Sequence, residues 1–307
     1  MDIDFISGIF FAAIRSGTPL LLVALGEMVL EKSGVLNLGQ EGMMLMGAVV
    51  GFMVTYQSDS LFLGFLIATF AGMVMATLFG LLSLNLNTNQ IATGLALTIF
   101  GTGLSAFLGA NYEGQAIFGL TPWEIPMISS IPLVGEALFS QDAVVYLSWI
   151  IFIGVYFLFK RTKLGLTIRA VGENPDAANA IGLSVYKIRF GALLFGGAMA
   201  GLAGSYLSLA YTPLWTENMT AGRGWIALAL VVFASWRAKN ILLGAYLFGF
   251  ASIIHLVAQG AGMSISANLL AMLPYVATII VLMLLSKQGQ LKQFEPMALA
   301  KPWRKNH

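Results

Sequence analysis

The sequence predicts an all-α protein, a polytopic membrane helical bundle, and three observations support this prediction. Of the 307 residues, 58% are hydrophobic and only 10% are charged, whereas soluble domains contain about 25% charged residues. Apolar stretches long enough to cross a bilayer follow one another along almost the whole chain. Lys and Arg gather in two segments that would then lie on the same side of the membrane.

About nine membrane-crossing helices are predicted, because a helix needs about 20 mostly apolar residues to cross the hydrocarbon core. The predicted spans are residues 5–29, 35–56, 61–84, 91–110, 143–159, 188–211, 225–236, 240–258 and 266–286. The first span follows Asp2 and Asp4 instead of a basic segment, so we expect a retained anchor and not a cleaved signal peptide. The segments 225–236 and 240–258 are short, which leaves open that one of them is broken or re-entrant.

The charges of the loops predict how the spans are oriented. The loop 160–189 and the tail 287–307 are rich in Lys and Arg, whereas the loop 111–142 has acidic residues and no Lys or Arg. Basic residues accumulate in the cytoplasmic loops of membrane proteins. We therefore expect 160–189 and 287–307 in the cytoplasm and 111–142 on the outer face. Because no linker divides the chain, residues 1–307 are expected to form a single transmembrane domain.

Glycines recur at helical spacing in several spans. Gly47 and Gly51 are four residues apart, as are Gly197 and Gly201, and Gly204 follows. Small residues at this spacing allow membrane helices to approach each other closely. We expect these glycines at packing positions within the bundle and not along a conduction path.

The loop 160–189 contains the signature of a short helix. Asn174 can cap it, Pro175 suits the first helical position, Asp176 suits the positive end of the helix dipole, and Gly182 can end it in a left-handed conformation. The small residues between them would form a short rod that fits a groove on another protein. The loop is therefore a candidate docking site, and the alternative is a solvated loop with one incidental helix.

A polar turn is predicted between the first two spans. Glu27 and Glu31 lie one helical turn apart, and Asn37, Gln40 and Glu41 follow at or inside the next span. Ionisable groups at membrane depth face protein or water, because exposing a charge to lipid costs about 2.5–3.5 kcal/mol. We name Asn37, Gln40 and Glu41 as candidate cargo contacts. The alternative is an interfacial turn that is held by hydrogen bonds.

A second polar cluster opens the fourth span and adds Asn87, Asn89 and Gln90 as candidate pathway residues. Amide side chains offer both donors and acceptors, which suits a neutral polar ligand such as a ribose or a base. Asn and Gln also form ordinary caps where a helix meets the membrane boundary, and this alternative stays open.

Several motifs are absent from the sequence, and their absence excludes classes of chemistry. There is no GxxxxGK[ST] phosphate loop for ATP hydrolysis, no HExxH zinc motif and no GxSxG nucleophile turn. No cysteine is present, which excludes thiolate metal sites. We therefore predict no catalytic residue, no metal site and no cofactor bound by this chain. A formal charge of +2 does not indicate a nucleic-acid partner.

Two stretches of this sequence resemble permease subunits of ATP-binding-cassette (ABC) importers. The segment 176–182, DAANAIG, is similar to their EAAxxxG pattern, with Asp in place of Glu. The run 169–178 resembles the branched-chain amino acid, simple sugar and nucleoside group, and the run 34–48 is most similar to the nucleoside branch. The resemblance covers nearly the whole chain.

The resemblance implies a permease that works with partners. Its loop helix would insert into a separate cytoplasmic ATPase, which uses ATP and Mg²⁺ to drive two permeases between inward-open and outward-open states. The residues implied for this coupling are Glu173, Asn174, Asp176, Ala177, Ala178 and Gly182. The loop 111–142 would help to receive an extracytoplasmic substrate-binding protein, and a paralogous permease would complete a heterodimer. The implied location is the bacterial cytoplasmic (inner) membrane, where the chain contacts lipid.

Alternatives to a nucleoside importer remain open at this point. Within the importer group, the alternative cargo is a simple sugar or a branched-chain amino acid. Outside the group, a proton-coupled secondary transporter would use Glu27, Glu31 or Glu41, because such a carrier needs intramembrane carboxylates. An intramembrane enzyme is the remaining class.

Overall fold

The structure is a computed structural model that describes residues 3–124, 131, 134–260, 272, 276 and 295–304. In this part of the chain all regular structure is helical, apart from one isolated β-bridge between Ala116 and Leu214. The α-helices are α1 (Ile3–Glu31), α2 (Gln40–Ser58), α3 (Leu61–Gly80), α4 (Gln90–Gly109), α5 (Val134–Phe139), α6 (Ala143–Arg161), α7 (Lys163–Glu173), α8 (Pro175–Ala180), α9 (Val185–Tyr206), α10 (Arg223–Phe233) and α11 (Ala238–Gly260). Short π-helical turns, Leu81–Asn85 and Leu207–Tyr211, extend α3 and α9.

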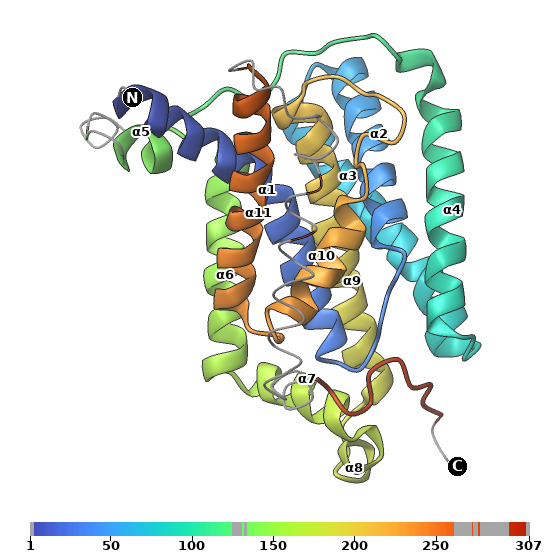
Figure 1. Cartoon of the computed structure of the whole chain (residues 1–307). Coiled ribbons are helices and arrows are strands. Elements are labelled where there is room, and N and C mark those ends of the chain that lie inside the picture. Colours follow the sequence, from blue (N-terminus) through green and yellow to red (C-terminus); the bar gives the residue numbers. More distant parts are fainter. Residues whose placement is uncertain are drawn as a thin grey trace.

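The long helices stand side by side, and α7 and α8 lie across one end of them (Figure 1). α9 packs against α1, α2 and α3 in the centre of this bundle. In the most apolar stretch of α9 and its extension, 83% is buried inside the protein. In the corresponding stretch of α6, only 22% is buried. The outer helices α3, α4 and α6 expose large apolar side chains, such as Phe62, Ile99 and Ile150. These exposed faces suit contact with lipid.

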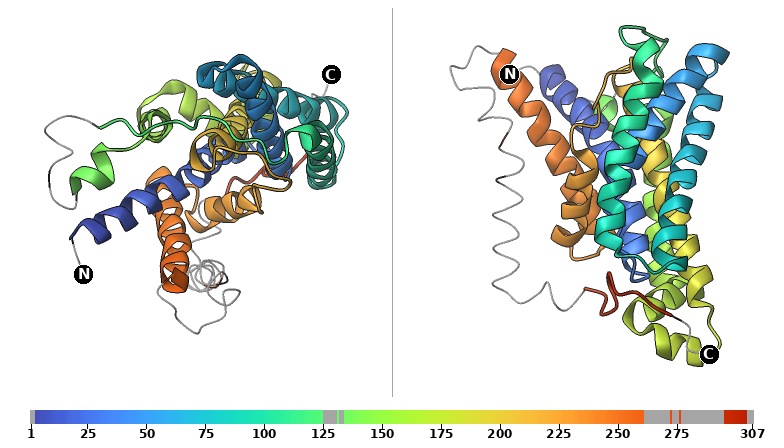
Figure 2. Two further views of the ribbon diagram at one scale, coloured as in Figure 1. Left: turned by 90° about the horizontal axis from the view of Figure 1, so that it is seen from above. Right: turned by 90° about the vertical axis from the view of Figure 1, so that its right-hand side faces the viewer.

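Five of the described helices are long and apolar enough to cross a membrane. They are residues 5–31, 61–85, 90–112, 143–161 and 185–211, and shorter apolar helices occupy 223–233 and 238–254. These helices coincide with seven of the predicted spans, and the predicted span 266–286 lies outside the described residues. The chain is therefore a multi-pass membrane helical bundle. Figure 2 shows the N-terminus at the opposite end of the bundle from α7, α8 and the residues near the C-terminus.

The prediction of a second span at 35–56 is wrong at its beginning. α2 begins only at Gln40, and residues 35–39 form a non-helical segment between α1 and α2. Gly34, with a φ of +89°, completes the turn that follows α1. α2 is not among the five apolar helices; it begins with the polar pair Gln40 and Glu41 and ends with Gln57 and Ser58.

The predicted glycine contacts are present where α2, α3 and α9 meet. A Cβ atom added to Gly201 would lie 3.1 Å from the Cα atom of Gly72, and it would also collide with the carbonyl oxygen of Ala68. A Cβ atom added to Gly47 would meet the backbone of Gly201. Only glycine therefore allows these three backbones to approach so closely.

Gly201→Ala should lower the free energy of unfolding by about 1–3 kcal/mol, because the added methyl group would push α3 and α9 apart. Gly191→Ala is the matched control, since it lies in the same helix and its added Cβ would meet nothing within 4 Å beyond its own helical turn. This control should be neutral or stabilising, because alanine favours a helix over glycine. Thermal unfolding of both variants in one detergent measures the difference. Equal stability of the two variants would contradict close packing at Gly201.

Candidate functional site

The loop between α6 and α9 contains the short helix that the sequence predicts. The Asn174 Oδ1 accepts a hydrogen bond from the Ala177 N–H (3.0 Å) and so caps α8. Pro175 is the first helical residue, and Gly182 has a left-handed φ of +87°. The Gly182 N–H donates to the Asn179 carbonyl oxygen (2.9 Å). The predicted cap, start and stop of this helix are therefore confirmed.

α8 projects at the end of the molecule, next to α7 (Figure 1). Ala178 anchors it, because this side chain is buried in a small apolar cluster with Val171 of α7. Asp176 and Ala177 are exposed, and 76% of Ile181 is exposed. The helix therefore offers acidic, small and apolar groups to a partner. The apolar group, Ile181, is not among the coupling residues that the sequence predicts.

The residues at 295–304 run along this loop, and sequence reasoning did not identify their contacts. The Trp303 indole N–H donates a hydrogen bond to the Asp176 Oδ1 (2.9 Å), from a position 127 residues later in the chain. The Ala298 N–H donates to the Gly172 carbonyl oxygen (2.9 Å). Because these partners are so distant in sequence, no local pattern signals them.

α7 rests directly on the turn that follows α1. A Cβ atom added to Gly172 would lie 3.2 Å from the backbone nitrogen of Gly34. The Arg189 guanidinium, from α9, donates through Nε to the Ser33 carbonyl oxygen (3.1 Å) and through Nη1 to the Lys301 carbonyl oxygen (3.3 Å). The helix that supports α8 is therefore joined to the interior of the bundle.

Glu27 lies at the centre of a buried polar cluster where α1 and α2 are separated. Its Oε1 accepts a hydrogen bond from the Asn37 N–H (3.2 Å), and its Oε2 accepts one from the Gln40 side-chain amide. The Asn37 Oδ1 accepts a hydrogen bond from the Gly39 N–H (2.9 Å). Glu27, Asn37 and Gln40 are each 0% exposed. The structure thus brings two predicted cargo residues together, and it gives both of them protein partners.

Glu41 binds the start of α10. Its Oε1 accepts hydrogen bonds from the Thr220 hydroxyl (2.5 Å) and the Gly222 N–H (2.8 Å), and its Oε2 accepts one from the Gly224 N–H (2.6 Å). A carboxylate is favoured here, because the first N–H groups of a helix lack acceptors and its dipole is positive at this end. The partners of this third predicted cargo residue are therefore also protein groups.

The second predicted cluster is divided between different environments. Asn89 is exposed and caps α4, since its Oδ1 accepts a hydrogen bond from the Ala92 N–H (3.0 Å). Gln90 is buried, and its Oε1 accepts a hydrogen bond from the Leu36 N–H (2.9 Å). Gln90 therefore joins α4 to the segment between α1 and α2. Asn87 is half-buried and has a left-handed φ of +53°.

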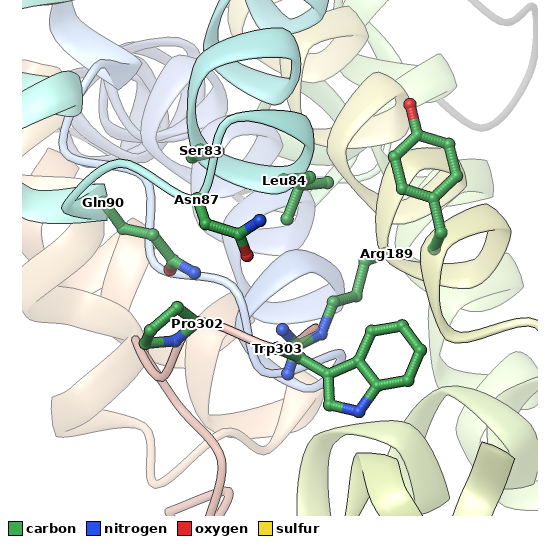
Figure 3. Close-up of a pocket in the computed structure, with 8 residues that line it drawn as sticks. Ser83, Leu84, Asn87, Gln90, Arg189, Pro302 and Trp303 are labelled. Atoms are coloured by element: carbon green, nitrogen blue, oxygen red, sulfur yellow. The ribbon is translucent and has the colours of Figure 1, made fainter. Parts of the chain in front are cut away.

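Asn87 and Gln90 lie in a small pocket with residues from two other parts of the chain. Figure 3 shows them near Arg189 of α9 and Trp303, which follow much later in the sequence. The Gln90 Nε2 and the Arg189 Nη2 are buried and have no hydrogen-bond partner in the described part of the chain. The pocket therefore presents two buried donors that remain available to a polar group.

Residues 9–285 match the protein family described as branched-chain amino acid transport system / permease component. The chain is 43% identical over 269 residues to the putative glucose ABC transporter permease protein TsgC13 of Haloferax volcanii, which covers 86% of this chain and 82% of that relative. It is 30% identical to the nucleoside ABC transporter permease protein NupC of Lactococcus lactis, over 87% of this chain and 88% of NupC. It is 31% identical to the guanosine ABC transporter permease protein NupQ of Bacillus subtilis, over 92% and 93%. No solved structure matches the chain.

Glu41→Gln should lower the free energy of unfolding by about 1–3 kcal/mol, because an amide cannot accept hydrogen bonds at both of its atoms and carries no charge. Glu113→Gln is the control, since it removes the same charge from an exposed position. Unfolding of both variants in one detergent measures the effect. Similar small losses in the two variants would show that Glu41 does not stabilise the start of α10.

Proposed function

This chain belongs to the family of permease components of branched-chain amino acid transport systems, and from that premise we propose that it conducts a nucleoside across the membrane. It is a permease subunit of an ABC importer, a transport subunit and not an enzyme, and it lies in the cytoplasmic (inner) membrane as a multi-pass protein. The observation that carries the proposed cargo is the similarity to NupC and NupQ along most of their length. The run 34–48, which suggested a nucleoside, surrounds the start of α2.

A simple sugar is the second candidate cargo. The chain is more similar to TsgC13, named as a putative glucose permease, than to the two nucleoside permeases. Ribose and glucose both present hydroxyl groups that amide side chains can bind. Asn87 and Gln90, which line the pocket in Figure 3, are the residues that we propose for polar contact with the cargo.

The other predicted pathway residues are assigned a supporting role. Asn37 and Gln40 bind Glu27, Glu41 binds the start of α10, and Asn89 caps α4. They would fix the helix ends beside the path without touching the cargo in this conformation. A proton-coupled carrier would instead need its buried carboxylates free to exchange protons.

α8 is proposed as the coupling helix that a separate ATPase grips. Its projection from the bundle and the exposure of Ile181 support this role, because docking would bury that apolar side chain. ATP and Mg²⁺ would be used by the ATPase, and this chain would respond through α7 and the turn after α1. The proposed coupling residues are Glu173, Asn174, Asp176, Ala177, Ala178 and Gly182. Because Trp303 binds Asp176, the tail would border the docking surface.

Two further partners complete the proposed transporter. A second, paralogous permease is supported by Lactococcus lactis, where NupC and the nucleoside permease NupB are both similar to this chain. A substrate-binding protein would dock at the loop 111–142, where Trp123 is 69% exposed. Residues 1–307 would then form one permease domain with nine crossings, the last at 266–286.

Gly182→Val should uncouple ATP hydrolysis from transport. A β-branched residue at this φ is strained by about 1–3 kcal/mol, although its added Cβ would meet nothing within 4 Å. Strain, and not collision, would therefore displace the end of α8. Gly182→Asn is the matched control, because asparagine tolerates the left-handed conformation. Both variants are compared in proteoliposomes that contain the whole transporter, and a wild-type ratio of uptake to hydrolysis in the valine variant would contradict the docking role.

Uptake by the reconstituted transporter tests the proposed cargo and energy source. Labelled guanosine should enter only with ATP and the ATPase present, and unlabelled nucleosides should compete with it while glucose should not. Glucose uptake that resists nucleosides would favour the sugar alternative. Uptake by this chain alone, driven by a proton gradient, would contradict the importer and support a carrier that uses Glu27, Glu31 or Glu41.

A further inference from the structure

A strongly basic groove lies at the end of α6 that leads into the cytoplasmic loop. It is formed by the ends of α1 and α6, by α7 and by the turn between α10 and α11, and its volume is about 490 Å³. Its basic residues are Lys32, Lys160, Arg169, Arg237 and Lys239, and no Asp or Glu is among the described residues that line it. The groove is distinct from the pocket in Figure 3 and from the proposed coupling helix.

The five basic residues of this groove outnumber the two carboxylates, Glu173 and Glu31, that attract Lys32. In the part of the chain that the structure describes, Lys32, Lys160, Arg169 and Lys239 form no ion pair, since the ion pair found there joins two other residues. Glu31, which accepts a hydrogen bond from the Trp236 indole (2.5 Å), and Glu173 do not line the groove. The groove therefore has an excess of positive charge that an anion would balance.

Aromatic rings hold several of these cations in place. The Nζ atoms of Lys160 and Lys239 lie 5.1 and 5.3 Å from the ring centroid of Tyr156, and the Lys32 Nζ lies 5.7 Å from that of Phe159. Such contacts contribute only about 0.5–1 kcal/mol at exposed sites, so they orient an ammonium group without replacing a counter-ion. Lys160 also donates a hydrogen bond to the Tyr156 hydroxyl (2.8 Å), so two lysines converge on one tyrosine that does not neutralise their charges.

The crowding of positive charge also affects Lys32. Burial, together with the neighbouring Arg169 guanidinium, lowers the pKa of the Lys32 ammonium to about 8. An anion bound among these groups would offset the repulsion between Arg169 and Lys32 and favour the charged form of the lysine.

The surroundings of the groove indicate that the anion comes from the membrane. Ile150, Ile153 and Phe157 are 65%, 50% and 51% exposed, and they lie at steps of three and four residues before Lys160. Residues at this spacing share one face of a helix, so an exposed apolar stripe leads along α6 to the groove. Basic pockets at the cytoplasmic ends of membrane helices attract anionic lipid headgroups. A lipid whose acyl chains lie on this stripe would place its phosphate beside Lys160.

We propose that this groove binds the phosphate headgroup of an anionic phospholipid in the cytoplasmic leaflet. Lys160 and Lys239 contact the phosphate at the mouth of the groove, and Lys32 and Arg169 contribute positive charge from its other walls. The site does not involve the cargo, so this proposal and the proposed nucleoside transport can be tested independently.

Lipid titration of the purified full-length chain tests this proposal. Phosphatidylglycerol and phosphatidylcholine with identical acyl chains are compared by native mass spectrometry of the retained lipid. Lys160→Gln combined with Lys239→Gln should weaken phosphatidylglycerol binding by about 25-fold, at about 5-fold for each cation near the membrane surface, and should leave phosphatidylcholine binding unchanged. Arg161→Gln combined with Lys163→Gln is the matched control, because it removes the same charge from exposed positions outside the groove. This control should change binding by less than about 2-fold, because charges that do not contact the phosphate are screened by water and salt.

Three results would overturn the proposal. Unchanged phosphatidylglycerol binding in the groove variant would exclude the site. Equal losses of binding in both double variants would show that the lipid is attracted by the general positive charge of this surface and not by the groove. Competition by glycerol phosphate at the same concentration as the lipid would assign the groove to a soluble phosphate. Thermal unfolding of each variant confirms that a loss of binding is not a loss of fold.

Discussion

The structure depends on how the backbone between α1 and α2 forms hydrogen bonds inside an apolar bundle. The helical ladder stops at the end of α1 and resumes at the start of α2, and each buried N–H group left unpaired between them would cost about 1–3 kcal/mol. Side chains supply the missing acceptors: Glu27 for the Asn37 N–H, Gln90 for the Leu36 N–H, and Asn37 itself for the Gly39 N–H. A non-helical segment is tolerated at this depth because protein groups satisfy it.

The same segment is connected to the end of the molecule where a partner would dock. α7 contacts the turn after α1 through Gly172, and Arg189 joins α9 to that turn at Ser33. Directly after this segment, Glu41 joins the start of α2 to α10. A displacement of α8 would therefore reach α2 and α10 through contiguous contacts, which is what the proposed coupling to an ATPase requires.

Local features of the fold were predictable from the sequence, and long-range polar contacts were not. The short helix α8 follows from its cap, its proline and its terminal glycine, all within residues 174–182. In contrast, Glu41 binds a threonine 179 positions later, and Asp176 binds Trp303, 127 positions later. Residues 35–39 were assigned to a span because they are mostly apolar, whereas hydrogen bonds to distant side chains hold them out of a helix. Asn37 and Gln40 do lie together around Glu27, but the partners of Glu41 and Gln90 could not be inferred from the sequence.

Amide hydrogen exchange of residues 35–41, in the purified chain, tests the central claim most directly. If side chains satisfy this segment, the N–H groups of Leu36, Asn37 and Gly39 should exchange nearly as slowly as those in the middle of α1. Glu27→Leu should accelerate the exchange of the Asn37 N–H by about tenfold, because its side-chain acceptor is lost. Exchange of the wild-type segment as fast as that of an exposed loop would contradict the account, because its backbone would then be bonded to water and not to the protein.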